Sequence, residues 1–120
     1  MAVSVLLVDD DPTFLSLAER TLACMGMDVV ATAQDPASAI AAANETRPDG
    51  ALVDIGLPDR EGIDLAYELA ALPWAPRVVL TSTDRDAGSA LDGHDGRGRL
   101  PFVPKEELAD VTLQRLLTAE

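Results

Sequence analysis

Cysteine, basic residues, aromatic residues and long apolar runs are all scarce in this sequence. A single cysteine among 120 residues excludes an internal disulfide bond, and we expect Cys24 to be a small buried side chain of a helix. No window of 18 uninterrupted apolar residues is present, so we expect no membrane span and a cytoplasmic location. Nine basic residues stand against 21 acidic ones, and this net charge of −12 argues against direct binding to nucleic acid or to an anionic membrane.

Five apolar runs of strand length alternate with five helix-like patterns. The runs cover residues 3–8, 27–32, 51–54, 77–81 and 100–103. Short apolar runs bounded by glycine and proline are typical of buried parallel strands. Their regular alternation with helices predicts one α/β domain over residues 1–120, a doubly wound parallel sheet with helices on both faces.

The helices are delimited by capping residues and by apolar stripes. Asp11-Pro12 and Asp35-Pro36 each predict a helix start, and Gly26 predicts the end of the first helix. The stripes that we expect to be buried are Phe14, Ala18, Leu22 and Met25, then Ala37, Ile40, Ala41 and Asn44, then Leu65, Ala66, Leu69 and Leu72, and, in a last helix over 106–118, Ala109, Leu113, Leu116 and Leu117. Four glycines weaken the pattern between residues 84 and 99, where we expect only a short helix over 84–91.

Polar side chains follow four of the five predicted strands. They are Asp9 and Asp10, Asp54, Thr81 and Ser82, and Lys105. The carboxyl ends of parallel strands meet at one edge of a sheet, where ligands bind. Carboxylates gathered in one pocket repel each other, so we expect at least one raised pKa. A hard cation relieves that repulsion, and carboxylates with retained waters suit Mg²⁺.

Such a site is suited to phosphoryl transfer. An acid that is not consumed as a metal ligand can attack phosphorus as a nucleophile. The metal, a lysine and a hydroxyl group then share the charge of the transferred group. We expect Asp11 to cap its helix rather than to act as a third metal ligand.

The motifs VLLVDDDP, LVDIGLPDREG, VVLTS and FVPK follow one another with a familiar spacing. In this order they resemble the receiver domain of bacterial two-component response regulators, over the whole chain. The resemblance implies a flavodoxin-like (βα)5 sandwich with five parallel strands in the order 2-1-3-4-5. It also implies a Mg²⁺-dependent phosphoacceptor rather than a turnover enzyme. The phosphoryl group would come from a histidine kinase or phosphotransfer protein. The output would be a protein-binding face, on a monomer or a phosphorylation-dependent dimer.

The resemblance assigns roles to the acids of the cluster. Asp54 matches the phosphoacceptor. Asp10 matches the acid that ligates Mg²⁺ directly, and Asp9 the acid that acts largely through water. Gly56 matches the position whose backbone carbonyl completes the metal site.

The resemblance also assigns the groups that sense phosphorylation. Lys105 matches the lysine that pairs with the phosphoryl group, and Phe102 matches the aromatic residue that changes rotamer on activation. The family also has a Ser/Thr hydroxyl that moves toward the phosphoryl group, the switch hydroxyl. Counting from Pro76 places it at Thr81, and counting from Asp54 allows Ser82 instead. Glu106 stands where the family usually has proline, and the glycine-rich stretch replaces a firm fourth helix.

Other functions remain as alternatives. A degenerate receiver would use the same fold as a docking module without phosphorylation. Residues 9–13 also match the pattern DxDxT, which resembles that of haloacid dehalogenase-like phosphatases. In that interpretation Asp9 would be the nucleophile and Asp11 the acid. The later acidic pair of those enzymes is missing from this sequence. A flavin-binding module is disfavoured because aromatic residues make up 3% of the chain.

Overall fold

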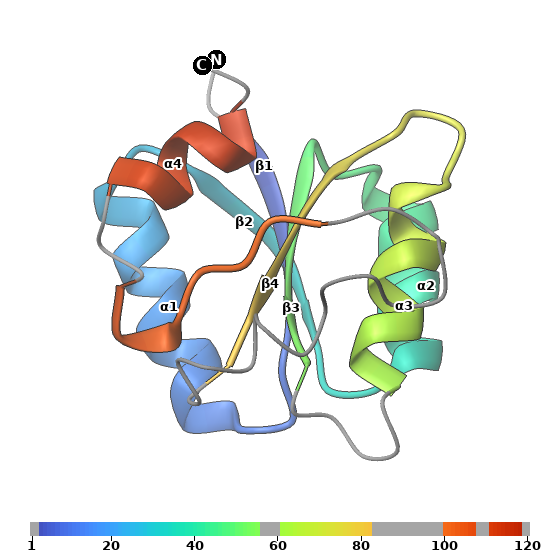
Figure 1. Cartoon of the computed structure of the whole chain (residues 1–120), viewed down its shortest axis with the longest axis horizontal. Coiled ribbons are helices and arrows are strands. Elements are labelled where there is room, and N and C mark those ends of the chain that lie inside the picture. Colours follow the sequence, from blue (N-terminus) through green and yellow to red (C-terminus); the bar gives the residue numbers. More distant parts are fainter. Residues whose placement is uncertain (1–2, 56–60, 83–99, 108–110, 119–120) are drawn as a thin grey trace.

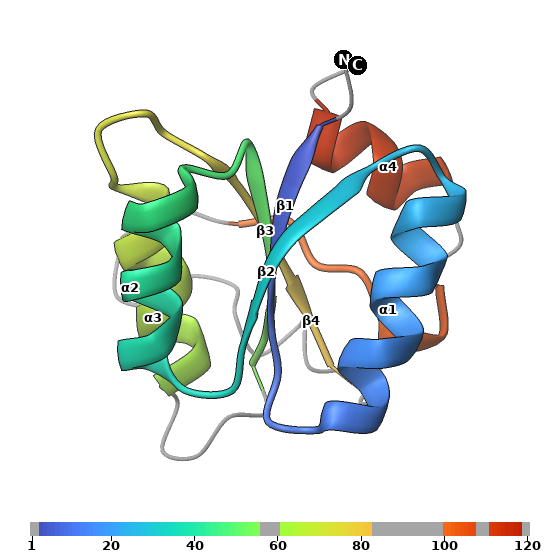
Figure 2. The ribbon, with the colours of Figure 1, turned by 180° about the vertical axis from the view of Figure 1, so that it is seen from behind.

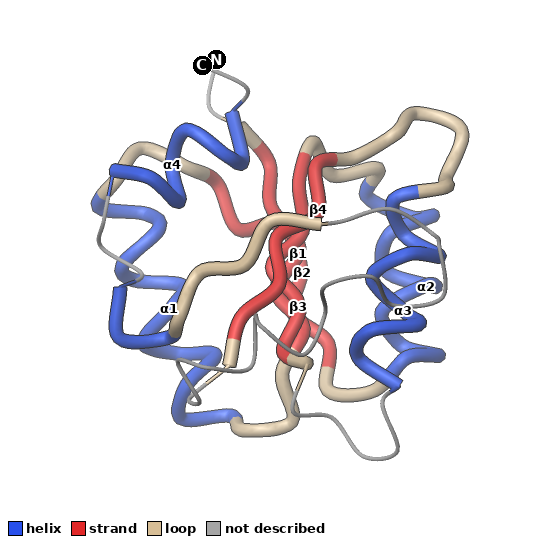
Figure 3. The backbone as a smooth tube through the Cα atoms, viewed as in Figure 1, coloured by secondary structure: helices blue, strands red, loops and turns tan. Residues whose placement is uncertain are grey.

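Four parallel strands form a single sheet in the order β2-β1-β3-β4 (Figures 1 and 3). The computed structural model describes residues 3–55, 61–82, 100–107 and 111–118. The strands are β1 (Ser4–Val8), β2 (Asp28–Ala33), β3 (Gly50–Asp54) and β4 (Arg77–Thr81). Each strand pairs in parallel with its neighbours, so the predicted α/β class and the order of the first four strands are confirmed.

Helices cover both faces of this sheet and produce three layers. They are α1 (Pro12–Cys24), α2 (Pro36–Thr46), α3 (Glu61–Ala70) and α4 (Val111–Thr118), with a 3-10 turn, η3 (Lys105–Glu107). Helices α1 and α4 lie on one face, and α2 and α3 on the other (Figures 1 and 2). Successive strand residues point to opposite faces, so Leu6, Val8, Val53 and Leu80 pack under α2 and α3, whereas Val5, Leu7, Leu52 and Val79 pack under α1 and α4.

Local capping chemistry sets the helix starts as predicted. The Asp11 side chain accepts a hydrogen bond from the Thr13 N–H at 2.9 Å, directly before Pro12. Asp35 accepts one from the Ser38 N–H at 2.8 Å, directly before Pro36. An acid that accepts otherwise unpaired amide hydrogens in the first turn stabilises a helix by about 1 kcal/mol.

The predicted fifth strand is represented in the described residues by one bridge, between Leu80 and Phe102. Leu80 N–H donates to the Pro101 carbonyl, and Val103 N–H donates to the Leu80 carbonyl, both at 2.8 Å. Extending this ladder backwards would require an N–H on residue 101 to donate to Val78. Proline has no N–H, so Pro101 limits the pairing on that side.

Some buried faces differ from the prediction. Cys24 is exposed, because it lies two residues beyond buried Leu22 and therefore about 200° around the helix. Leu15 is buried in α1, whereas Phe14 is only half-buried. In α2 the buried residues are Ala39 and Ala43, and of the predicted stripe Ala37, Ala41 and Asn44 are exposed and Ile40 is half-buried. The alanine-rich sequence of α2 offers almost equally apolar faces, so periodicity alone could not choose between them.

The last helix buries the predicted side chains Leu113 and Leu117, with Leu116 half-buried. Ala109, the short helix expected over 84–91 and Gly56 lie outside the described residues. Within the described part of the chain, no helix is both long and apolar enough to cross a membrane.

Candidate functional site

Strand register brings three polar side chains to one side of the sheet at its carboxyl edge. Asp54 is in register with Thr81 across β3 and β4, and Asp9 directly follows the last residue of β1. Two residues earlier in each strand, a core side chain packs under α1 and α4: Leu7, Leu52 and Val79. Side chains two residues apart share a face of a strand. The alternation that builds this half of the core therefore also places Asp9, Asp54 and Thr81 together.

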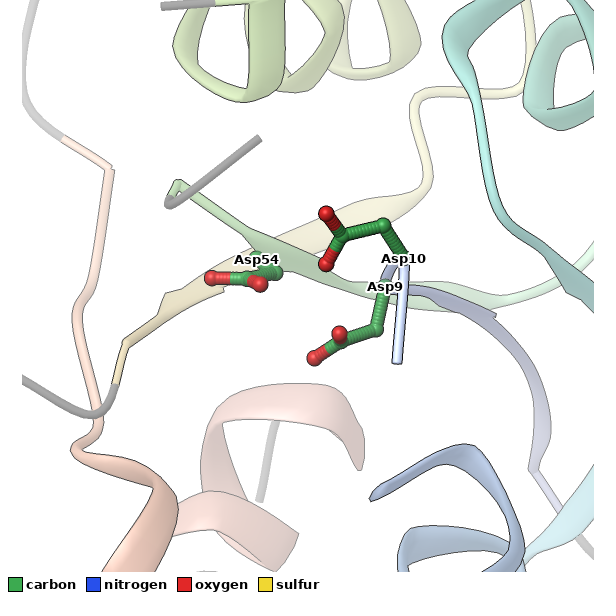
Figure 4. Close-up of side chains that lie close together, drawn as sticks. All are labelled: Asp9, Asp10 and Asp54. Carbon is green, nitrogen blue, oxygen red and sulfur yellow. The ribbon is translucent and has the colours of Figure 1, made fainter. Parts of the chain in front are cut away.

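The carboxylates form a compact and largely buried cluster. Asp9 is 1% exposed and Asp54 is 5% exposed, whereas Asp10 lies at the surface. One oxygen from each of these three acids lies within 4.8 Å of the other two, and Figure 4 shows the carboxyl groups gathered at the ends of β1 and β3. Carboxylates this close together repel one another, and their negative charge is costly to bury unless a cation pairs with it or one group takes up a proton.

Lys105 supplies one positive charge to the cluster from a distant part of the chain. Its Nζ lies 2.6 Å from Asp9 Oδ2 and 3.4 Å from Asp54 Oδ2. Its backbone N–H donates to the Ser82 carbonyl at 2.9 Å, which ties the start of η3 to the end of β4. The Lys105 ammonium group also lies over the ring of Phe14, 4.1 Å from the ring centroid.

The surroundings of the cluster shift the pKa values of two groups, Asp9 and Lys105. The pKa of Asp9 is raised, mainly because the carboxyl group is buried. The hydrogen bonds from Lys105 and from the Asp11 N–H oppose this rise, and the negative charge of Asp54 adds to it. Burial alone would lower the pKa of Lys105, but its contacts with Asp9 and Asp54 outweigh burial and raise it. The predicted raised carboxyl pKa is confirmed, and its main cause is burial rather than repulsion between the acids.

The cluster suits a divalent cation. In the described part of the chain, the three carboxylates are accompanied by one ammonium group, that of Lys105, which leaves an excess of negative charge when all three acids are ionised. Two ligands on opposite sides of Mg²⁺ lie about 4.2 Å apart, since each bond is about 2.0–2.1 Å. Oxygens that all lie within 4.8 Å of one another can therefore reach a common ion. Asp11 is not part of this donor set, because its carboxylate caps α1.

The hydroxyl groups at the end of β4 are both buried, Thr81 at 1% exposure and Ser82 at 7%. Among the described residues, Thr81 Oγ1 has no hydrogen-bond partner. A buried hydroxyl without a partner costs about 1–3 kcal/mol, so an acceptor at this position would be stabilising. Phe102 is half-buried and pairs with Leu80, the strand residue directly before Thr81.

Gly62 has a structural role at the site that its sequence position alone did not reveal. A Cβ atom at this position would lie 2.3 Å from the Asp54 carbonyl oxygen and 2.9 Å from Ile55 Cα. The start of α3 therefore packs directly on the backbone that carries Asp54. A glycine eight residues after a strand-end acid was the available signal, but spacing gives no information on backbone contact.

We predict that Gly62→Ala destabilises the protein by about 1–3 kcal/mol, the usual cost of overpacking, and weakens Mg²⁺ binding. The added methyl group must push α3 away from the backbone of Asp54. Urea unfolding and calorimetric Mg²⁺ titration test this. Gly26→Ala is the control. Gly26 has a φ of 85°, which an alanine adopts only with strain, but an added Cβ would meet no atom within 4 Å. This variant should therefore lose stability but bind Mg²⁺ normally. Wild-type stability and Mg²⁺ affinity in Gly62→Ala would contradict the prediction.

The sequence and the fold agree with one known family. The profile of the response regulator receiver domain matches residues 5–114 of the chain. The chain belongs to the response regulator receiver family. The predicted family, the flavodoxin-like fold and a place in two-component signal transduction are thereby confirmed, and the family match favours the receiver over the phosphatase suggested by DxDxT.

Several known proteins are similar to this receiver. The probable transcriptional regulatory protein TcrX of Mycobacterium tuberculosis is 39% identical over 98 residues, which cover 78% of this chain and 42% of TcrX. Transcriptional regulatory protein KdpE of the same organism is 41% identical over 108 residues, which cover 88% of this chain and 47% of KdpE. The receiver thus spans somewhat less than half the length of these relatives.

The fold is also similar to that of solved receivers. A two-component response regulator of the LuxR family from Aurantimonas sp. SI85-9A1 superposes with a TM-score of 0.82 at 25% identity, covering 100% of this chain and 88% of that chain. This agreement spans the strands and helices that position the acidic cluster.

Proposed function

We propose that this receiver accepts a phosphoryl group on Asp54 from a phosphohistidine of a histidine kinase or phosphotransfer protein. The groups that surround Asp54 support this function most directly. Its buried carboxylate lies beside two further acids and an ammonium group, in register with Thr81, whose hydroxyl has no hydrogen-bond partner in the described part of the chain. A nucleophile, a cation-binding cluster, a lysine and a free donor are the groups that phosphoryl transfer uses.

In the proposed step, one Asp54 oxygen attacks the phosphorus atom. A P–O bond forms while the P–N bond to the donor imidazole breaks, and the imidazole nitrogen keeps the electron pair. Lys105, 3.4 Å from Asp54 Oδ2, would pair with an oxygen of the transferred group. Thr81 Oγ1 would donate a hydrogen bond to another, and its register with Asp54 supports Thr81 over Ser82 as the switch hydroxyl.

Asp9, Asp10 and Asp54 would hold the Mg²⁺ ion, with the backbone carbonyl of Gly56 as a further ligand. When bound, the ion would share the negative charge of the phosphoryl oxygens. Both oxygens of Asp9 already have partners, since Oδ1 accepts the Asp11 N–H at 2.9 Å and Oδ2 lies 2.6 Å from Lys105 Nζ, so Asp9 would act on the ion largely through water. We also propose that the receiver can remove the phosphoryl group from Asp54 itself.

The proposed output is a change of the surface near the end of β4. Phosphorylation adds about two negative charges and three acceptor oxygens, which would draw Thr81 inward and let Phe102 follow. A shift from 1% to 99% active requires the modification to favour the active form by about 5.5 kcal/mol.

We propose that residues 1–120 act as one cytoplasmic receiver domain, as a monomer or a phosphorylation-dependent dimer, and that the changed face binds a protein. TcrX and KdpE are named as transcriptional regulators, so a partner or attached region, rather than this acidic domain, would contact DNA.

The test is intact mass after incubation with acetyl phosphate, with Mg²⁺ or with EDTA. We expect a gain of one phosphoryl group with Mg²⁺ and none with EDTA. A folded wild type that neither gains mass nor binds Mg²⁺ would refute the proposal and support the degenerate docking module.

A further inference from the structure

Within the described residues, the ammonium group of Lys105 contacts three side chains, and the proposed chemistry uses only the two carboxylates. Two contacts are with carboxylates, at 2.6 Å from Asp9 Oδ2 and 3.4 Å from Asp54 Oδ2. The third is with the face of the Phe14 ring, whose centroid lies 4.1 Å from Nζ. An ammonium group has three hydrogens, and the Lys105 side chain is 13% exposed. The ring therefore occupies a side of the cation that water would otherwise solvate.

Both partners of this contact are anchored independently of each other. Phe14 lies in the first turn of α1, where the Asp11 cap and the hydrogen bond from Asp11 N–H to Asp9 Oδ1 fix the helix beside the cluster. Lys105 is anchored by its backbone hydrogen bond to Ser82. The contact thus joins two segments that are each held by hydrogen bonds of their own, which is how a preorganised site is built.

The burial of Phe14 also argues for a role beyond core packing. Leu15, Ala18 and Leu22 fill the buried face of α1, whereas Phe14 is only half-buried at the edge of that core. The face of an aromatic ring carries negative potential and attracts a cation within about 6 Å. A leucine at this position would fill similar space without attracting Lys105.

We propose that the ring of Phe14 is a positioning group for Lys105, holding its ammonium between Asp9 and Asp54 by a cation–π contact. The inference rests on the proposed function, because the purpose of this position is to present the cation to the phosphoryl group on Asp54. Phe14 does not touch the reacting atoms and acts through Lys105.

This role predicts opposite changes in two properties. In Phe14→Leu the ammonium is freer to leave the carboxylates, so it competes less with Mg²⁺, and Mg²⁺ should bind about threefold to tenfold more tightly. Phosphorylation by acetyl phosphate at saturating Mg²⁺ should slow by a similar factor, because the cation is less often in place. A variant that merely loosened the fold would weaken both properties.

The variants are compared by calorimetric Mg²⁺ titration and by the rate of mass gain with acetyl phosphate. Phe14→Tyr keeps the ring and should behave like wild type. Site-specific trifluorophenylalanine at position 14 keeps the shape but removes the negative potential of the ring, and should behave like Phe14→Leu. Leu17→Ala is the matched control, since it removes an apolar side chain from the 52%-exposed position of the same helix and should change neither property.

A spectroscopic measurement tests the contact without any phosphorylation. The Cε protons of Lys105 should be shifted upfield by the ring current in wild type and in Phe14→Tyr, and should return to ordinary values in Phe14→Leu. Unchanged Lys105 shifts and unchanged Mg²⁺ affinity in Phe14→Leu would overturn the inference. If wild type gains no phosphoryl group, the proposed function fails, and the magnesium and NMR results still decide whether Phe14 positions Lys105.

Discussion

Asp54→Asn is expected to abolish the Mg²⁺-dependent gain of a phosphoryl group while leaving the protein folded. The amide has nearly the shape of the carboxylate, so the packing around this 5%-exposed side chain is retained. The amide oxygen is a poor nucleophile, so the acyl phosphate does not form. Removing one charge from the cluster also relieves repulsion with Asp9, so we expect the melting temperature to be equal or higher.

The measurement is intact mass with acetyl phosphate and Mg²⁺, together with a thermal melt. Asp28→Asn is the matched control, because it makes the same chemical change at an exposed acid at the start of β2, and it should accept the phosphoryl group normally. A mass gain that persists in Asp54→Asn would move the acceptor elsewhere. Continuous phosphate release with an unchanged rate in the variant would instead indicate a phosphatase that uses Asp9.

Lys105→Met is expected to produce the second large effect, on both phosphorylation and stability. Methionine keeps much of the length of the side chain but removes the charge. Phosphorylation should slow by about 10²–10³, as when a group that stabilises transition-state charge is lost. Asp9 is 1% exposed, and removing one partner of a buried ion pair costs about 3–5 kcal/mol because the other charge is left uncompensated.

The loss of stability in Lys105→Met should depend on pH in a defined direction. The folded-state pKa of Asp9 is already above its ordinary value of 3.8 because of burial, and it rises further without Lys105. A carboxyl group whose pKa is raised on folding stabilises the fold below its unfolded pKa, and this contribution is lost as the pH rises through the folded pKa. The variant should therefore be least stable relative to wild type near neutral pH and should approach it as the pH falls towards 4.

Wild type should show a further change at the alkaline end. The pKa of Lys105 is raised above its ordinary value of 10.5 by its partners. Its contribution is therefore present below that value and is lost as the pH rises through the raised pKa. Urea unfolding across the pH range measures both effects, with Arg20→Met on the exposed face of α1 as the control for loss of a positive charge. A constant difference between Lys105→Met and wild type at all pH values would contradict this account.

Much of the site was predictable because it lies at strand ends. Asp9 and Asp54 directly follow apolar runs, and parallel strands bring their carboxyl ends to one edge. Periodicity could not show that Gly62 packs against the backbone of Asp54, or that Phe14, at the edge of the core, also faces Lys105. Both contacts join segments whose approach is set by helix packing, which leaves no local pattern in the sequence.

The alternation of strands and helices, the capped helix starts and the polar strand ends follow from the sequence, since these features depend on neighbours a few residues away. Tertiary structure decided which face of α2 is buried, that Cys24 is exposed and that Thr81 stands in register with Asp54. It also decided that a single lysine pairs with two buried acids beneath an aromatic ring. These features depend on how the helices pack on a twisted sheet, where residues far apart in the chain meet and their burial and charge are set jointly.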